Sequence, residues 1–205
     1  MASGQTANYQ LNQWEAEDKV LRTEFNADNA KLDAALAELA AEVEGAVQAN
    51  PYQKLAHVAV TQAADTVTLD LSGVDLSQYQ ALELYAALLM GSENSNVSVL
   101  CNDVTDGYGL VGGGSSGRRL ADMMPGTGQQ PGMELLRILL GQNTISGIYQ
   151  GNRWVNNEYQ SYGPISACLR LDPAQLTKLK LVGEGASAAS QILPGSEFTL
   201  YGLKK

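Results

Sequence analysis

The spacing of apolar residues changes near residue 50. Between residues 17 and 50 they recur at intervals of three and four, which places them along one face of an α-helix. The pair Asn50–Pro51 ends this pattern. Proline cannot continue a helix, and it excludes the preceding residue from the helical region of backbone space. The sequence therefore predicts one long helix that stops at Asn50.

The apolar face of this helix has the spacing of a coiled-coil seam. Its positions follow each other at alternating intervals of four and three and include one asparagine: Phe25, Asn29, Leu32, Leu36, Leu39, Val43 and Ala46. The run covers about three heptads, so it also fits an amphipathic helix that packs on its own domain. Because no strong domain precedes the helix and a break follows it, we expect the face to bind further copies of the same chain. Residues 1–50 are therefore interpreted as an anchor and a helical oligomerisation segment.

After Pro51, apolar and polar residues alternate with a period of two, the pattern of strands with one buried face. In TVTLDLSGVDL, for example, Val67, Leu69 and Leu71 share a face. The same alternation recurs in NVSVLC, ELLRILLG, ISACLRL, LTKLKLVG and EFTLYGL. YQALELYAALLM fits a strand or a helix, and we favour a strand because strands surround it. Such short strands, separated by turn residues, predict an antiparallel β-sandwich or jelly roll over residues 51–205.

A glycine-rich segment, GYGLVGGGSSGRRLADMMPGTGQQPG at residues 107–132, interrupts these strands. It contains the glycine spacings of a dinucleotide fingerprint and of a P-loop, which bind phosphate at the start of a following helix. Pro125 and Pro131 prevent such a helix, and Arg118 and Arg119 stand where a P-loop has lysine and then serine or threonine. We therefore interpret the segment as a long loop with both arginines, as binding candidates, at its tip. The alternative is a disordered insertion without a partner.

Composition and charge exclude several classes of partner. The chain has 205 residues and a formal net charge of −9, whereas nucleic acids are bound by clustered Lys and Arg. No stretch approaches the roughly 18 apolar residues of a membrane span, and the start of the chain does not have the pattern of a signal peptide. We therefore expect synthesis in a cytosol, no nucleic-acid partner and no membrane partner. Cys101 and Cys168 fall on the apolar and polar faces of different strands and are expected as free thiols.

Signals for catalysis are weak. His57 is the only histidine, so catalytic triads and zinc centres lack parts, and we expect neither a metal nor a cofactor. The segment NDVTDGYG loosely matches a calcium loop but lacks its closing glutamate, which favours an acidic turn. A carboxylate pair would suit a jelly-roll glycoside hydrolase, which stays as the enzymatic alternative. The acidic residues available for such a pair are Asp70, Asp75, Asp103 and Asp106.

The segment IYQGNRWVNNEYQSYG places aromatic rings among amide side chains. This combination suits a sugar site, because rings stack on the apolar face of a sugar and amides bind its hydroxyls. The binding candidates in this segment are Trp154, Asn156, Tyr159 and Tyr162. The alternative is that the aromatic residues cover a sheet face, as they often do in strands. The polarity around Trp154 suits an exposed loop better than a core.

Both ends of the chain resemble one group of proteins. NYQLNQWEAEDKVLRTEFNADNAKLDAAL, residues 8–36, resembles the N-terminal segment of tail-associated structural proteins encoded by phages and prophages of low-GC Gram-positive gut bacteria. The C-terminal LPGSEFTLYGLKK resembles the GS-(F/I)-TLYG ending of the β-domains in that group. Together the two segments cover roughly a fifth of the chain.

The resemblance implies a virion component of the tail, baseplate or fibre, present in the host cytoplasm during assembly. It implies a homo-oligomer, with a trimer favoured, and contacts with other tail proteins through the N-terminal segment, where Tyr9 and Trp14 are candidates. The alternative for these two residues is packing on the first turn of the helix. The β-domain is then structural or a receptor-binding domain, with host cell-wall carbohydrate as the expected ligand.

Overall fold

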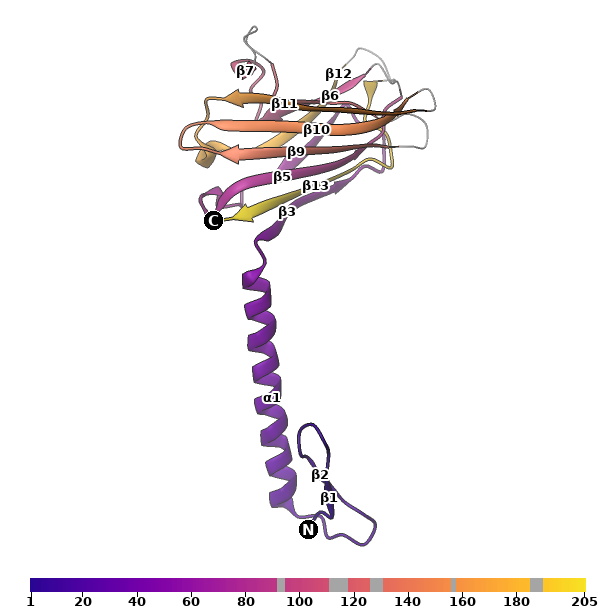
Figure 1. Ribbon diagram of the computed structural model, residues 1–205, viewed down its shortest axis with the longest axis vertical. Helices are drawn as coiled ribbons and strands as arrows, with labels where there is room; N and C mark the ends of the chain where they lie inside the picture. The colour runs from indigo at the N-terminus through magenta and orange to yellow at the C-terminus, as the bar shows by residue number, and fades with distance from the viewer. Residues whose placement is uncertain (92–94, 111–117, 126–130, 156–157, 185–189) are drawn as a thin grey trace. The chain divides into compact units, whose positions relative to one another are not determined.

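The computed structural model describes residues 1–91, 95–110, 118–125, 131–155, 158–184 and 190–205 (Figure 1). The chain divides into two compact units, Met1–Asn50 and Pro51–Lys205. The first unit is helical and the second consists of β-sheets, so the change in apolar spacing near residue 50 coincides with a change of architecture.

The N-terminal unit consists of a small hairpin and one helix. Strands β1 (Gly4–Gln5) and β2 (Asn12–Gln13) pair antiparallel, and helix α1 spans Arg22–Ala49. The prediction that the helix stops before Pro51 is confirmed: Asn50 has an extended backbone, with φ −71° and ψ 116°.

Within the described part of the second unit, two antiparallel sheets form a β-sandwich. In spatial order, the seven-stranded sheet contains β3 (Tyr52–Ala59), β13 (Glu197–Lys204), β5 (Tyr79–Leu88), β9 (Gly132–Leu140), β10 (Ile145–Val155), β11 (Glu158–Leu169) and β7 (Tyr108–Leu110). The four-stranded sheet contains β4 (Thr66–Asp70), β12 (Lys178–Glu184), β6 (Asn96–Cys101) and β8 (Ala121–Met123). Two short 3-10 helices, η1 (Leu76–Gln78) and η2 (Pro173–Gln175), lie in the connections. The predicted fold class is confirmed.

The chain passes repeatedly from one sheet to the other, and this crossing gives the sandwich its jelly-roll character. Outside the β9–β10–β11 meander, each strand from β3 to β13 lies in a different sheet from the strand that precedes it. The inward faces of both sheets share one core of leucine, valine and aromatic side chains. In β5, Leu82, Leu84 and Leu88 are fully buried, which confirms the prediction of a strand for this segment.

The prediction of one long loop over residues 107–132 is wrong in part, because β7 and β8 lie within it. Three apolar side chains of the segment, Tyr108, Leu120 and Met123, are buried in the core and hold it against the sandwich. The hydroxyl of Tyr108 accepts a hydrogen bond from the backbone N–H of Cys101 at 2.9 Å and donates one to the carbonyl of Val104 at 3.1 Å. Residues 111–117 and 126–130 lie outside the described ranges.

The aromatic segment around residue 154 forms the β10–β11 hairpin rather than a loop. Its backbone pairs Trp154 with Tyr159 and Arg153 with Gln160, and Tyr149 is buried in the core. Tyrosine, tryptophan and valine favour extended backbone, and this preference prevails over the polarity of the neighbouring amides.

We expect the substitution Tyr108→Phe to lower the free energy of unfolding by about 1–3 kcal/mol, because it leaves the buried N–H of Cys101 without its acceptor. Urea denaturation measures this change. Tyr9→Phe is the control, because the Tyr9 side chain is exposed and its loss of a hydroxyl should change stability by less than about 0.5 kcal/mol. Equal stability of the two variants would contradict the stabilising role of the Tyr108 hydroxyl.

Candidate functional sites

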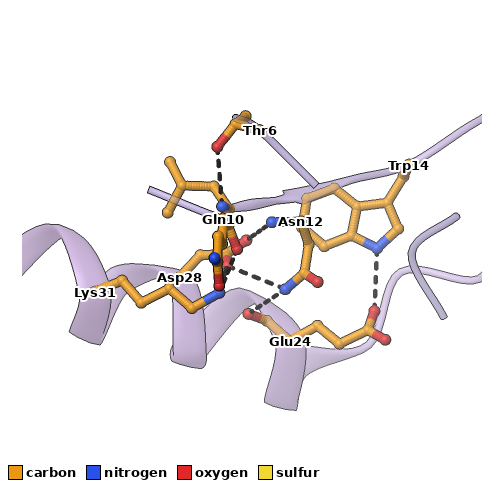
Figure 2. A network of polar contacts seen from close by, with 8 residues as sticks. Thr6, Gln10, Asn12, Trp14, Glu24, Asp28 and Lys31 are labelled. Carbon is orange, nitrogen blue, oxygen red and sulfur yellow. Dashed lines mark hydrogen bonds and ion pairs between the residues drawn. The ribbon is translucent and has the colours of Figure 1, made fainter. Parts of the chain in front are cut away.

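The hairpin of the N-terminal unit is fixed to α1 by a polar network (Figure 2). The backbone N–H of Asn12 donates to Asp28 Oδ2 at 2.9 Å, and its side-chain Nδ2 donates to Asp28 Oδ1 at 3.0 Å. The indole N–H of Trp14 donates to Glu24 Oε2 at 3.1 Å. The ammonium of Lys31 donates to the carbonyl of Gln10 and lies 3.5 Å from Asp28.

These contacts place Trp14 against the first turn of α1, which is the second of the two roles expected for it. Tyr9, the other candidate for contact with tail proteins, stays exposed on the hairpin side of this unit. The Asp28 carboxylate is buried, and both of its oxygens accept hydrogen bonds from Asn12. The hairpin is therefore held in a defined position on α1 by these hydrogen bonds.

The predicted seam lies beside the stripe that the hairpin covers. Glu24, Asp28 and Lys31 contact the hairpin through successive turns of one helix face. The apolar seam positions follow the adjacent face and are between 41% and 64% exposed: Phe25, Leu32, Leu36, Leu39 and Val43. Asn29 is exposed among them. Within this unit the hairpin thus satisfies the polar stripe and leaves the apolar stripe in water.

We expect Asp28→Asn to loosen the hairpin, because an amide presents N–H groups where the carboxylate accepts two bonds from Asn12. Amide hydrogen exchange at Asn12 should accelerate by roughly tenfold or more, as for the loss of a buried hydrogen bond. Asp33→Asn on the same helix is the matched control, since Asp33 is exposed. Equal acceleration in both variants would show that the network does not hold the hairpin.

The structure gives the two candidate arginines different environments. Arg119 forms an ion pair with Asp122 at 3.2 Å and another with Glu184, and it donates to Ser98 Oγ at 3.0 Å. It thereby joins β8, β12 and β6 of the four-stranded sheet. Arg118 is exposed. In this arrangement Arg119 stabilises a sheet, and Arg118 is the arginine that remains available to a ligand.

The aromatic candidates belong to a strand pair, but their side chains lie outside the described part of the chain. The backbones of Trp154, Tyr159 and Tyr162 belong to β10 and β11, whereas Asn156 lies wholly outside the described residues. Their role in binding remains a prediction.

Three of the four carboxylates considered for catalysis are engaged in turns and ion pairs, and Asp106 is exposed. Asp70 accepts from the backbone N–H of Ser72 at 2.9 Å, and Asp75 accepts from that of Ser77 at 3.1 Å. Asp103 contacts the ammonium groups of Lys178 and Lys180 at 2.7 and 3.2 Å. These hydrogen bonds and charges hold the pKa of each carboxyl below its ordinary value, which suits a charged structural group and not a general acid.

The turn that resembles a calcium loop is ordered by its own asparagine. Asn102 has a left-handed backbone, with φ 54°, and its Oδ1 accepts from the N–H of Thr177 at 2.9 Å. In the described ranges, no cluster of three or more His, Cys, Asp or Glu residues is placed to hold a metal ion. His57 is exposed and its Nδ1 lies 3.0 Å from Thr199 Oγ1. Cys101 and Cys168 are both free thiols, as predicted, and burial raises the pKa of Cys101 to about 12.

Sequence reasoning missed a carboxyl group inside the sandwich. Glu134 lies on β9 and faces the core beside Tyr149, in the space that the missing side chain of Gly151 leaves. A Cβ atom at Gly151 would lie 1.6 Å from Glu134 Oε2. Burial raises the pKa of Glu134 to about 8, and Tyr149 and Arg153 offset this only in part. The signal in the sequence was its alternation with Leu136 and Ile138, which puts all three on one face.

We expect Glu134 to make stability depend on pH. Between its ordinary pKa of 4.5 and its folded pKa of about 8, the folded chain keeps a proton that the unfolded chain has released. The free energy of unfolding therefore falls as pH rises through this window, by about 1.4 kcal/mol for each pH unit, and levels off above it. Urea denaturation at pH 5 and pH 8 measures the slope. Glu134→Gln should remove most of it, and an unchanged slope in that variant would contradict the assignment.

No model of a known protein family matches this chain, and no curated protein matches it either. Across the residues that the structure covers, no helix has both the length and the apolar character needed to cross a bilayer.

Proposed function

We propose that the chain is a tail-associated structural protein of a phage or prophage of low-GC Gram-positive bacteria. It self-associates through α1 and presents its β-sandwich to the host cell surface. The resemblance of residues 8–36 and of the C-terminal segment supports the virion assignment. The observation that carries self-association is the exposed apolar seam of α1.

The seam needs a partner for physical reasons. Full burial of a leucine, valine or phenylalanine side chain contributes about 1.5–3 kcal/mol, and five such side chains in the seam of α1 remain largely in water. Their spacing alternates between four and three and so stays in register with an identical helix. The hairpin does not compete for this face, because it binds the adjacent stripe. We favour a trimer on the resemblance, with Asn29 as the polar position that fixes the register.

The ordered hairpin supports a second part of the proposal, contact with other tail proteins. It holds Tyr9 exposed while Trp14 and Asp28 fix its position on the helix. A preorganised surface loses less conformational entropy when it binds, which favours its use in assembly.

Self-association is tested with two charge substitutions on the same helix turn. Leu36→Glu places a carboxylate in the seam, whereas Ala37→Glu places one on the exposed neighbouring face. One chain has a mass of 21.8 kDa. By light scattering, we expect the native protein and Ala37→Glu to have three times this mass, and Leu36→Glu to have the mass of a single chain. A native chain that is monomeric at micromolar concentration would refute self-association through α1.

The virion assignment has a test of its own. The coding sequence should lie among genes for tail proteins, holin and endolysin, and the protein should be found in purified particles after prophage induction. A locus without phage genes would contradict the assignment but would leave the oligomerisation result unaffected.

A further inference from the structure

A hollow lies over the outward face of the seven-stranded sheet. Strand pairing aligns Thr199, Tyr85, Leu135 and Gln150 in one row across β13, β5, β9 and β10, four strands that lie side by side in Figure 1. The next row contains Glu197, Ala87, Met133, Asn152 and Ser161. Because Leu84, Ala86 and Leu88 point into the core, these alternate positions point away from it. Together they line a hollow of about 530 Å³, a volume typical of ligand sites.

One aromatic ring in this hollow is exposed yet held in place. The Tyr85 hydroxyl donates to Glu83 Oε2 at 2.9 Å, and its ring packs edge-to-face on Tyr201, with centroids 5.9 Å apart. Glu83 is buried and is itself held by Arg137, whose Nε donates to it at 2.8 Å. Tyr85 nevertheless remains 46% exposed. A ring fixed before binding loses little conformational freedom when a ligand stacks on it.

The groups around the ring are neutral hydrogen-bonding side chains. Gln150 and Asn152 each offer an amide with two donors and one acceptor oxygen, and Ser161 and Thr199 offer hydroxyls. Among the described residues that line the hollow there is no lysine or arginine, and the acidic side chain on its outward face is Glu197, since the Glu134 side chain faces the core. This charge distribution disfavours phosphate and sulfate polymers.

From this arrangement we propose that the hollow binds a neutral sugar unit of a cell-surface glycan. The sugar ring stacks on Tyr85, and its hydroxyls exchange hydrogen bonds with Gln150, Asn152 and Ser161. The described side chains that line the hollow are those of other residues than the aromatic candidates Trp154, Tyr159 and Tyr162. The inference rests on the proposed host-surface role and gives that role a binding site and a class of ligand.

The test measures binding of the full chain to soluble oligosaccharides by calorimetry. The probes are neutral trisaccharides of glucose and of N-acetylglucosamine, a purified neutral cell-wall polysaccharide, and poly(glycerol phosphate) teichoic acid as the anionic comparison. We expect a neutral probe to bind more tightly than teichoic acid. Tyr85→Ala should weaken that binding roughly tenfold or more, as for the loss of a central aromatic contact.

Two matched variants separate ring stacking from other effects. Tyr85→Phe keeps the ring and loses only the bond to Glu83, so its affinity should stay within about threefold of the native value. Tyr9→Ala removes an exposed tyrosine from the N-terminal unit and should change nothing. Thermal unfolding of each variant confirms that the fold is intact.

Three results would overturn the inference: no binding to any neutral probe, tighter binding to teichoic acid, or native affinity in Tyr85→Ala. If no neutral sugar binds and Tyr85→Ala changes the mass of the native oligomer in light scattering, the hollow is a protein contact instead. The Leu36→Glu variant distinguishes the inference from the proposed assembly. Its affinity for a trisaccharide, per chain, should equal the native value even where self-association is lost.

Discussion

Burial of one face of each sheet against the other is the constraint on which the β unit depends. Because side chains alternate along a strand, the inward placement of Leu82 and Leu84 sends Glu83 and Tyr85 to the outer face. The same rule places Glu134 inside, where a charged carboxylate is unfavourable, so its pKa rises. The neutral form of Glu134 is thus favoured inside the sandwich, whereas Glu83 on the outer face is paired with Arg137.

The N-terminal unit follows a different constraint, the satisfaction of polar groups on a narrow helix. Asp28 and Glu24 receive the hydrogen bonds of the hairpin and occupy one stripe of α1. The adjacent stripe is apolar and exposed, and a helix gains most of its stability from packing such a stripe. The proposed self-association would supply that packing without displacing the hairpin. Neighbouring faces of one helix thus differ in character: one holds the hairpin through polar contacts, and the other is an exposed apolar seam.

Local signals in the sequence were sufficient for the fold class and for the C-terminal end of the helix, but they missed the strands β7 and β8 within residues 107–132. Pro51 marks the end of α1, and the strands on either side of the ambiguous segment YQALELYAALLM favoured the strand that the structure shows as β5. The arrangement of the candidate sites depends instead on register between distant segments. Tyr85 lies opposite Thr199, and Arg119 bonds to Glu184, although no local pattern links either pair. For the segment that contains Tyr149, the sequence left both an exposed loop and a strand open, because local polarity competed with strand propensity; the structure shows the strand pair β10–β11.

An open hollow on a sheet face encloses a ligand only partly, so one site of this kind binds a sugar weakly. Several joined copies of the site would bind more tightly than one. When several copies are joined, the second and later contacts with a repeating polymer become intramolecular, and avidity can exceed the single-site affinity by roughly 100-fold to 10,000-fold. A surface glycan is such a polymer, and α1 is the element that would join the copies. Weak sites would suit the proposed tail protein for a second reason, since each contact would form and break independently while the particle stayed attached. The exposed seam of α1 and the shallow site at Tyr85 are therefore most useful in the same molecule.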